Sequence, residues 1–232
     1  MEKFISIQKD FDKLIGGGLI SGNITHIYGP PASGKTNFAM IAMKNAAKEG
    51  KVIFIDSEGG FSIERLKQIS GEEFENVLKN LLLIEPTDYD EQKVAIKKLD
   101  ELVPKVSAKL VIVDSIAVLY RLEEEKDVKE LGRQLAQLLK VARKNNIPVL
   151  ITNQVYTDIN TQKVVPIGGD ILRYWAKIVI SLEKFNDRRF AILEKHKFLP
   201  EGAKLEFKIC EKGIEIIEEE VESSKTQQPS LI

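Results

Sequence analysis

One segment of the chain combines glycines, a lysine and a hydroxyl at the spacing that phosphate binding requires. The pattern Gly-x-x-x-x-Gly-Lys-Thr occupies positions 29–36, between an apolar run at 24–28 and a helix-like run at 37–44. In this order of strand, loop and helix, the N–H groups of the loop and of the helix start can surround a phosphate. We therefore predict a nucleotide site. The alternative is an ordinary glycine-containing turn.

The residues predicted to bind the phosphates and the metal follow one another. Lys35 is expected to reach the β and γ phosphates, and the hydroxyl of Thr36 is expected to hold Mg²⁺. The whole predicted loop consists of Gly29, Pro30, Pro31, Ala32, Ser33, Gly34, Lys35 and Thr36.

An acid and an amide follow two further apolar runs. Asp114 ends the run at 110–114, where a Walker B acid must lie to hold the water-ligated Mg²⁺ beside Thr36. Gln154 closes the run at 148–154, where its amide can touch a γ phosphate and pass that contact to the next loop. The alternatives are an aspartate that caps the next turn and a surface glutamine.

A third polar residue is a candidate for activating water. Glu58 lies two residues after Asp56, which ends another apolar run. Phosphoryl transfer relies mainly on positioning and electrostatics, so that one carboxylate is enough to orient or deprotonate the attacking water. The alternative is a solvated loop glutamate.

The elements that must position these residues alternate along the chain. Strands are predicted at 24–28, 51–56, 81–84, 110–114 and 148–154, and helices at 62–69, 88–103 and 128–145, with Pro104 just beyond the second helix. This alternation predicts an α/β fold with a mostly parallel, twisted sheet flanked by helices and joined by right-handed crossovers.

The pattern changes after residue 154. Residues 155–170 are predicted to form a polar loop, and short strands at 178–183, 190–195, 205–209 and 214–217 are predicted to form antiparallel hairpins at one sheet edge. We expect residues 1–217 to form one core and residues 218–232, which are too polar to pack, to form a disordered acidic tail.

Composition limits the function classes. The 232 residues fit one large domain, and a net charge of -1 gives no overall attraction to nucleic acid or to anionic lipid. Cys210 is the only cysteine, and His26 and His196 are too few for a metal cluster. Because no stretch approaches about 18 uninterrupted apolar residues, we expect a cytoplasmic protein that does not bind a membrane.

Several motifs resemble those of one family. The chain resembles RecA-type recombinases of the archaeal and eukaryotic kind over nearly its whole length, because the following motifs share their order and similar spacing: 29–36, 56–66, 114–115, 119–121, 133–134, 152–155 and 166–169. It is most similar to a short archaeal paralogue, without an amino-terminal helical domain.

The resemblance implies a fold, two cofactors and residue roles. The fold is a RecA-like P-loop ATPase core, and the cofactors are ATP and Mg²⁺. The matching residues imply Glu58 as the base of a weak ATPase, Arg65 stacking near adenine, and Gln154 sensing the γ phosphate, with Lys35 on phosphate and Asp114 near the metal.

The chain departs from strand-exchanging relatives in the loops that bind DNA. Where those relatives carry Gly-Arg-Gly, this chain has three consecutive carboxylates at 123–125, which repel phosphate. The second loop, at 156–171, has Lys163 as its only cation. We expect weak, non-specific DNA binding without strand exchange. The candidate contacts are Arg121, Lys163, Gly168, Gly169 and Arg173.

Aromatic residues and a basic patch lie near that second loop. Tyr156, Tyr174 and Trp175 are predicted to belong to the core rather than to stack on bases. Lys195 and Lys197 resemble bacterial lysines that reach the ATP of a neighbouring subunit, which would imply a homo-oligomer. The alternative is a solvated sheet edge.

The sequence therefore predicts an ATP-binding, weakly hydrolysing accessory protein of DNA repair and recombination, which regulates a recombinase or a structure-specific nuclease. One alternative is a non-enzymatic, ATP-dependent switch or adaptor. Another is a signalling ATPase of the wider RecA superfamily.

Overall fold

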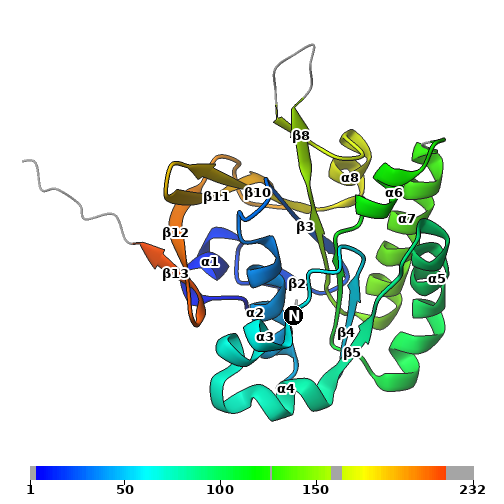
Figure 1. Ribbon diagram of the computed structural model, residues 1–232, viewed down its shortest axis with the longest axis horizontal. Helices are drawn as coiled ribbons and strands as arrows, with labels where there is room; N and C mark the ends of the chain where they lie inside the picture. Colours follow the sequence, from blue (N-terminus) through cyan, green and yellow to red (C-terminus); the bar gives the residue numbers. More distant parts are fainter. Residues whose placement is uncertain (1–3, 126, 158–163, 218–232) are drawn as a thin grey trace, which may run out of the picture.

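A large, mostly parallel sheet organises the computed structural model, which describes residues 4–125, 127–157 and 164–217. Its nine strands lie in the order β13-β12-β11-β10-β3-β7-β6-β4-β5 (Figure 1). Their bounds are β3 Ile24–Tyr28, β4 Val52–Asp56, β5 Leu81–Ile84, β6 Leu110–Asp114, β7 Val149–Asn153, β10 Ile178–Phe185, β11 Arg188–Lys195, β12 Lys204–Cys210 and β13 Gly213–Ile217. The predicted fold class is confirmed.

The apolar runs become parallel strands because helices cover both sheet faces. Every residue of β4, β6 and β7 is buried, as expected for strands that alternate with crossover helices. β10 pairs in parallel with β3 and antiparallel with β11, so it joins the parallel half of the sheet to the predicted hairpins. Two small sheets flank this core: β1 Phe4–Ile5 with β2 Leu19–Ile20, and β8 Val155–Thr157 with β9 Val164–Pro166.

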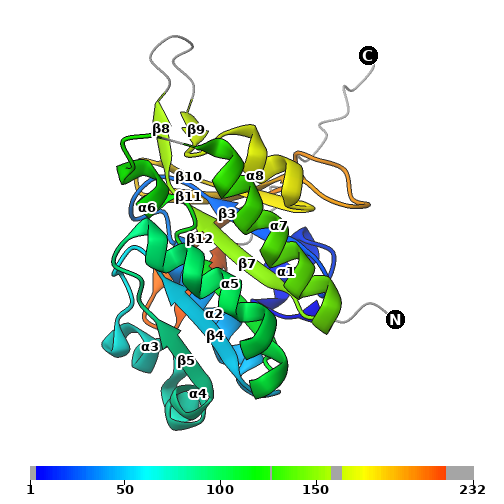
Figure 2. The same cartoon turned by 90° about the vertical axis from the view of Figure 1, so that its right-hand side faces the viewer.

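The helices divide between the two faces of the sheet (Figures 1 and 2). One face carries α1 Lys9–Leu14, α2 Lys35–Ala46, α3 Ile63–Ser70, a 3-10 turn at Gly71–Glu73, and α4 Phe74–Asn80. The other face carries α5 Tyr89–Val106, α6 Val118–Leu122, α7 Val128–Asn145 and α8 Asp170–Trp175. In the described part of the chain, no helix combines the length and apolar character that crossing a membrane requires.

Helix starts follow local capping chemistry. Side-chain oxygens of Ser62, Asp88 and Asp127 accept hydrogen bonds from backbone N–H groups in the first turns of α3, α5 and α7, respectively. These bonds satisfy donors that a helix start otherwise leaves unpaired. The caps therefore account for the agreement between predicted and observed helix starts.

Phe38, on helix α2, packs against core residues of α1 and β12. Its ring is fully buried and lies 4.5 Å from the Phe11 ring and 5.2 Å from the Phe207 ring, measured between centroids. We expect Phe38→Ala to lower the free energy of unfolding by about 3–5 kcal/mol, because it leaves a cavity where three elements meet. Urea denaturation measures this change. Phe185→Ala is the control, because Phe185 is 70% exposed, and an equal loss in both variants would contradict the prediction.

Several local predictions were wrong. Helix α5 continues through Pro104 to Val106, because a proline in the last turn removes a single backbone hydrogen bond. The predicted polar loop at 155–170 contains β8 and β9, which pair antiparallel. Helices α6 and α8 were not predicted, because five or six residues are too few to show a helical period.

The aromatic residues near the second loop also differ from the prediction. Tyr156 and Tyr174 are exposed, at 45% and 71%, rather than core residues, and Trp175 is half-buried. Tyr174 instead meets Trp175 edge to face on α8. Lys163 and the predicted acidic tail at 218–232 lie outside the described residues.

Candidate functional site

The glycine-rich loop connects β3 to α2 at the carboxyl end of the sheet. Ala32 and Gly34 have positive φ angles of 58° and 108°, and α2 begins at Lys35. A Cβ atom added at Gly29 would lie 2.4 Å from the carbonyl oxygen of Leu182, so glycine alone fits there. The loop therefore curves around the start of α2, whose N–H groups bear partial positive charge.

Lys35 lies inside this curve and is 5% exposed. Its Nζ donates hydrogen bonds to the carbonyl oxygens of Gly29 at 2.9 Å and Pro30 at 3.0 Å, and to Oε1 of Gln154 at 3.3 Å. Burial lowers the pKa of Lys35, and the carboxylates of Glu58 and Asp114 oppose this shift. A bound phosphate would supply the full negative charge that neutral carbonyls lack.

A buried carboxylate lies beside the hydroxyl of Thr36. Thr36 Oγ1 donates to Oδ2 of Asp114 at 2.7 Å, and Thr152 donates to Oδ1 of the same carboxylate. Burial is the main cause that raises the pKa of Asp114, and the nearby carboxylates add to it, while the two hydroxyl donors oppose it. A divalent cation would offset this cost, and the hydroxyl and carboxylate oxygens are ligands that suit Mg²⁺.

The loop after β4 places Glu58 opposite Lys35. Oδ1 of Asp56 accepts hydrogen bonds from the N–H groups of residues 58, 59 and 60, and its Oδ2 accepts one from Phe61. Glu58 then receives a hydrogen bond of 2.7 Å on its Oε1 from Nε2 of Gln154. Gln154 therefore bridges Lys35 and Glu58, and the five candidates for phosphate, metal and water chemistry lie together.

Three serine hydroxyls at this end of the sheet are buried without hydrogen-bond partners among the described residues. They belong to Ser33 in the glycine-rich loop, Ser57 after β4 and Ser115 after β6. A buried hydroxyl without a partner costs free energy. A polar ligand or its bound water would supply the missing partners, so these hydroxyls fit a site that takes a hydrated metal and phosphates.

Arg65, implied by the resemblance to stack near adenine, lies at the side of this group. Its guanidinium donates to Oδ1 of Asn37 on α2 and to the carbonyl oxygens of Cys210 and Gly213 beside the β12–β13 turn. These contacts fix the guanidinium plane between α2 and the hairpin. Its predicted role toward adenine stays a prediction.

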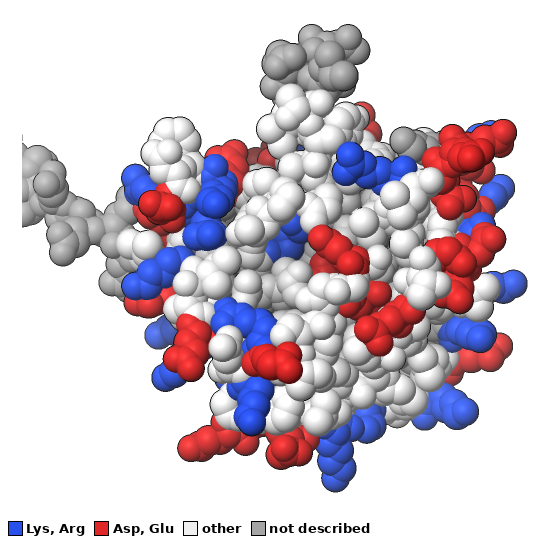
Figure 3. Space-filling view, in the orientation of Figure 1, with Lys and Arg blue, Asp and Glu red and all other residues white. Residues whose placement is uncertain are grey.

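Three of the DNA-contact candidates line a pocket whose lining contains none of the phosphate and metal candidates. Arg121, Gly168 and Gly169 line one pocket of about 580 Å³, together with Tyr120, Val128, Tyr156 and Ile167. Acidic side chains gather over the connection between α6 and α7 (Figure 3), where 123–125 are exposed. Residues 123–125 lie in the chain between two lining residues of the pocket, Arg121 and Val128, and we call them its acidic border.

Two other cations predicted to contact DNA or a neighbouring ATP make contacts within the chain. Arg173 forms ion pairs with Glu194 at 3.5 Å and Glu201 at 3.4 Å. Nζ of Lys195 donates to the carbonyl oxygens of Arg173 and Ala176. Arg173, on helix α8, and Lys195, on β11, therefore have partners within the chain. Lys197, in the connection after β11, also makes a contact.

Three residues of the site were missed by the sequence analysis. Asp56 organises the Glu58 loop, Thr152 donates to Asp114, and Asn153 donates from Nδ2 to the carbonyl oxygen of Ile167 at 2.7 Å. All three are buried polar residues at the ends of apolar strands. That position at strand ends was the signal available in the sequence.

Comparison with known proteins places the chain in a family. The Rad51 family model matches residues 3–217. The chain belongs to the Rad51 family. A DNA repair and recombination protein RadB from Methanosphaera stadtmanae is 42% identical over 219 residues, covering 90% of this chain and 94% of that protein. RadB from Methanocaldococcus jannaschii is 44% identical over 213 residues, covering 89% and 99%.

A solved structure gives the same result. The crystal structure of the RadB recombinase superposes with a TM-score of 0.82 at 41% identity, covering 93% of this chain and 100% of that one. The resemblance to RecA-type recombinases and to their short archaeal paralogue is therefore confirmed for this Rad51-family chain.

Proposed function

We propose that this chain binds ATP with Mg²⁺, hydrolyses ATP slowly, and acts in DNA repair and recombination as an accessory protein. The observation that carries this proposal is the convergence of Lys35, Thr36, Asp114, Glu58 and Gln154 at the carboxyl end of the sheet. Lys35 and the loop would bind the phosphates, Thr36 and Asp114 would hold the cation, and the cation would neutralise charge on the phosphates.

We infer slow turnover from the contact between Gln154 and Glu58. The Gln154 amide engages the Glu58 carboxylate at 2.7 Å. Oε2 of Glu58 is still able to accept a proton from water, but the Gln154 amide that is held by Glu58 and Lys35 would have to turn before it could contact a γ phosphate. A single-turnover assay with radiolabelled ATP tests the proposal, and the absence of any phosphate release would favour the non-enzymatic switch.

We propose that regulation of a recombinase or a structure-specific nuclease in the cytoplasm is the biological role. The RadB relatives are DNA repair and recombination proteins by name, and the acidic border at 123–125 opposes the strong DNA contact that strand exchange requires. Affinity capture with purified candidate recombinases and nucleases, with and without ATP, tests this role. If none of these proteins is captured, either with or without ATP, the proposed role is wrong.

DNA affinity gives a separate prediction. Arg173 and a further cation, Arg188 at the start of β11, both form ion pairs with glutamates, which reduces their availability for phosphate. We expect weak binding of single-stranded DNA whose affinity falls as salt rises, with a slope of about -2 in log affinity against log salt. Changing residues 123–125 from Glu to Gln should tighten binding several-fold, because it removes three repulsive charges.

Fluorescence anisotropy at several salt concentrations measures both quantities. The control changes Glu72, Glu75 and Glu101 to Gln, which removes the same charge from helices outside the 580 Å³ pocket. Equal tightening by both triple variants would show that net charge, rather than this surface, controls DNA affinity.

A further inference from the structure

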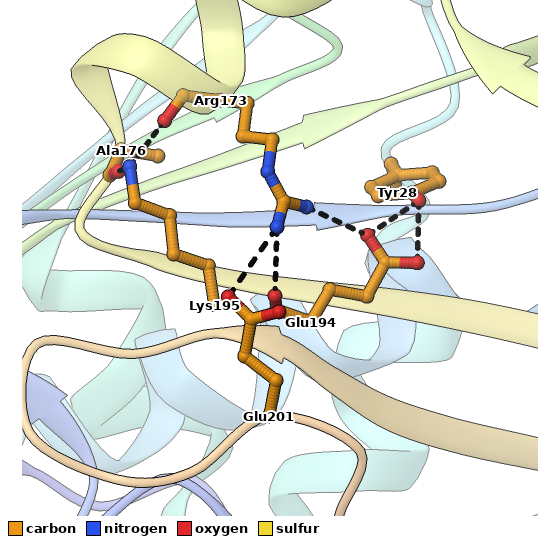
Figure 4. Close-up of polar contacts among 6 residues, drawn as sticks. All are labelled: Tyr28, Arg173, Ala176, Glu194, Lys195 and Glu201. Atoms are coloured by element: carbon orange, nitrogen blue, oxygen red, sulfur yellow. Dashed lines mark hydrogen bonds and ion pairs between the residues drawn. The ribbon is translucent and has the colours of Figure 1, made fainter.

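A polar cluster lies between strand β3 and helix α8, outside the group of phosphate and metal candidates (Figure 4). Tyr28 is the last residue of β3, so it directly precedes Gly29 of the glycine-rich loop. Arg173 belongs to α8, and Glu194 belongs to β11. Three elements that are far apart in the sequence therefore meet immediately behind the phosphate loop.

Glu194 contacts both of the other elements. Both of its carboxylate oxygens accept from the Tyr28 hydroxyl at 2.7 Å, and Oε2 lies 3.5 Å from Nη1 of Arg173. Nη2 of Arg173 also donates to the backbone oxygen of Glu194 at 3.0 Å. Burial, followed by the Glu194 carboxylate, raises the pKa of Tyr28, so the phenol keeps the proton that it donates.

Helix α8 is attached to β11 at its C-terminal end, and the segment before its N-terminal end is attached to β7. At its C-terminal end, Lys195 donates to the carbonyl oxygens of Arg173 and Ala176. Before its N-terminal end, the carbonyl oxygen of Ile167 accepts from Asn153, the neighbour of Gln154. One route to α8 therefore starts at β7 and Gln154, and the other starts at β3 and Tyr28.

A cavity of about 200 Å³ beside the cluster leaves room for movement. Its lining includes His26, Tyr28, Asp170, Arg173 and Glu194. His26 is 1% exposed, and neither of its ring nitrogens has a partner among the described residues. Since close packing resists displacement, unfilled space here allows α8 to shift relative to β3.

We propose that Glu194 is a positioning residue that couples helix α8 to the phosphate loop through Tyr28 and Arg173. This inference rests on the proposed function, because it requires a nucleotide at the loop. A bound phosphate competes for Lys35 with the carbonyl oxygens of Gly29 and Pro30, which follow Tyr28 directly. The end of β3 then moves with the loop, and the Tyr28–Glu194–Arg173 contacts carry that movement to α8.

The contacts are better suited to coupling than to stability. Arg173 and Glu194 are 45% and 28% exposed, and ion pairs at such exposure contribute little to folding. The same contacts join the phosphate-loop strand to the helix that follows Gly168 and Gly169. Nucleotide binding would therefore affect the 580 Å³ pocket lined by Gly168 and Gly169 through contacts that do not include Gln154.

Hydrogen exchange measured by mass spectrometry tests this coupling on the full chain. It compares nucleotide-free protein with protein saturated with Mg²⁺ and a non-hydrolysable ATP analogue. In wild type, we expect the analogue to slow amide exchange in residues 170–176 by about fivefold or more, the lower end of typical coupling between sites. In Tyr28→Phe and Glu194→Gln, we expect a change of less than about twofold.

Two controls separate coupling from general loosening. Glu215→Gln removes an equal charge from an exposed pair with Lys208 at 3.1 Å, and should leave the wild-type response intact. Combining Tyr28→Phe with Arg173→Gln should have no larger effect than either change alone, because both act through Glu194. Peptides covering 164–169 should keep part of their response in every variant, through Asn153 and Gln154.

The outcomes distinguish this inference from the proposed function. The variants could exchange amides faster both with and without the analogue, while the ratio of the two exchange rates stays that of wild type. In that case the contacts are merely structural and the inference is wrong. The inference is also wrong if calorimetry shows that wild type binds the analogue but amide exchange in residues 170–176 does not change. If wild type fails to bind the analogue, the proposed function itself is wrong, and this coupling falls with it.

Discussion

Replacing Lys35 with Ala is expected to weaken ATP binding about 10- to 150-fold. The change removes a charge-assisted hydrogen bond, which contributes about 1.5–3 kcal/mol. Lys35 is buried within the curve of the loop, and among the described residues its Nζ donates to neutral oxygens alone, so a phosphate would be its strongest partner. Isothermal titration calorimetry with Mg²⁺ and ATP measures the affinity.

Lys44→Ala is the matched control for this change. Lys44 lies on the same helix, α2, and faces Glu73 at 3.6 Å rather than the loop. We expect its affinity for ATP to equal that of wild type within about twofold, because a distant surface charge is screened. ATP affinity unaffected by Lys35→Ala would remove the phosphate-binding role of the glycine-rich loop.

Changing Glu58 to Gln should leave ATP binding nearly unchanged and lower the hydrolysis rate by about 10²- to 10⁴-fold. The substitution keeps the size of the side chain and removes the carboxylate that orients or deprotonates water in the transition state. Glu58 is exposed and its backbone is fixed by Asp56, so the loop should keep its conformation. Phosphate release under single-turnover conditions gives the rate.

Glu64→Gln provides the comparison, since it removes the same charge from the exposed first turn of α3. Its hydrolysis rate should match that of wild type. If Glu58→Gln and Lys35→Ala both hydrolysed ATP at the wild-type rate, the activity would belong to a contaminant, and the non-enzymatic switch would be the better description.

The parallel half of the fold was predictable because its signals are local. Apolar runs such as 110–114 are long enough to identify buried strands, and helix starts at Ser62, Asp88 and Asp127 carry their own caps. The glycine-rich loop was equally clear, because its chemistry depends on eight consecutive residues and on the strand and helix beside them. The positions of Asp114, Glu58 and Gln154 followed from strand ends meeting at one end of a parallel sheet.

Other features depend on contacts that no local pattern contains. The short helices α6 and α8 form without a recognisable helical period in the sequence. Helix α8 is held against β11 by two hydrogen bonds, one from Arg173 to Glu194 and one from Lys195 to Arg173. Likewise, the exposure of Tyr174 depends on how α8 lies on the sheet.

The sequence by itself determined the family and the parallel strands, because the order of motifs and the apolar runs can be followed along the chain. It also named the candidate phosphate-binding residues, because these are neighbours within one strand–loop–helix unit. Only the tertiary structure decided which charges are available to a ligand. Arg173 is paired with Glu194, and Glu194 is bonded to Tyr28, across 166 positions of the chain. Such partners are brought together by strand order, since β10 lies between β3 and β11 and pairs with both strands, and strand order is a property of the whole folded sheet.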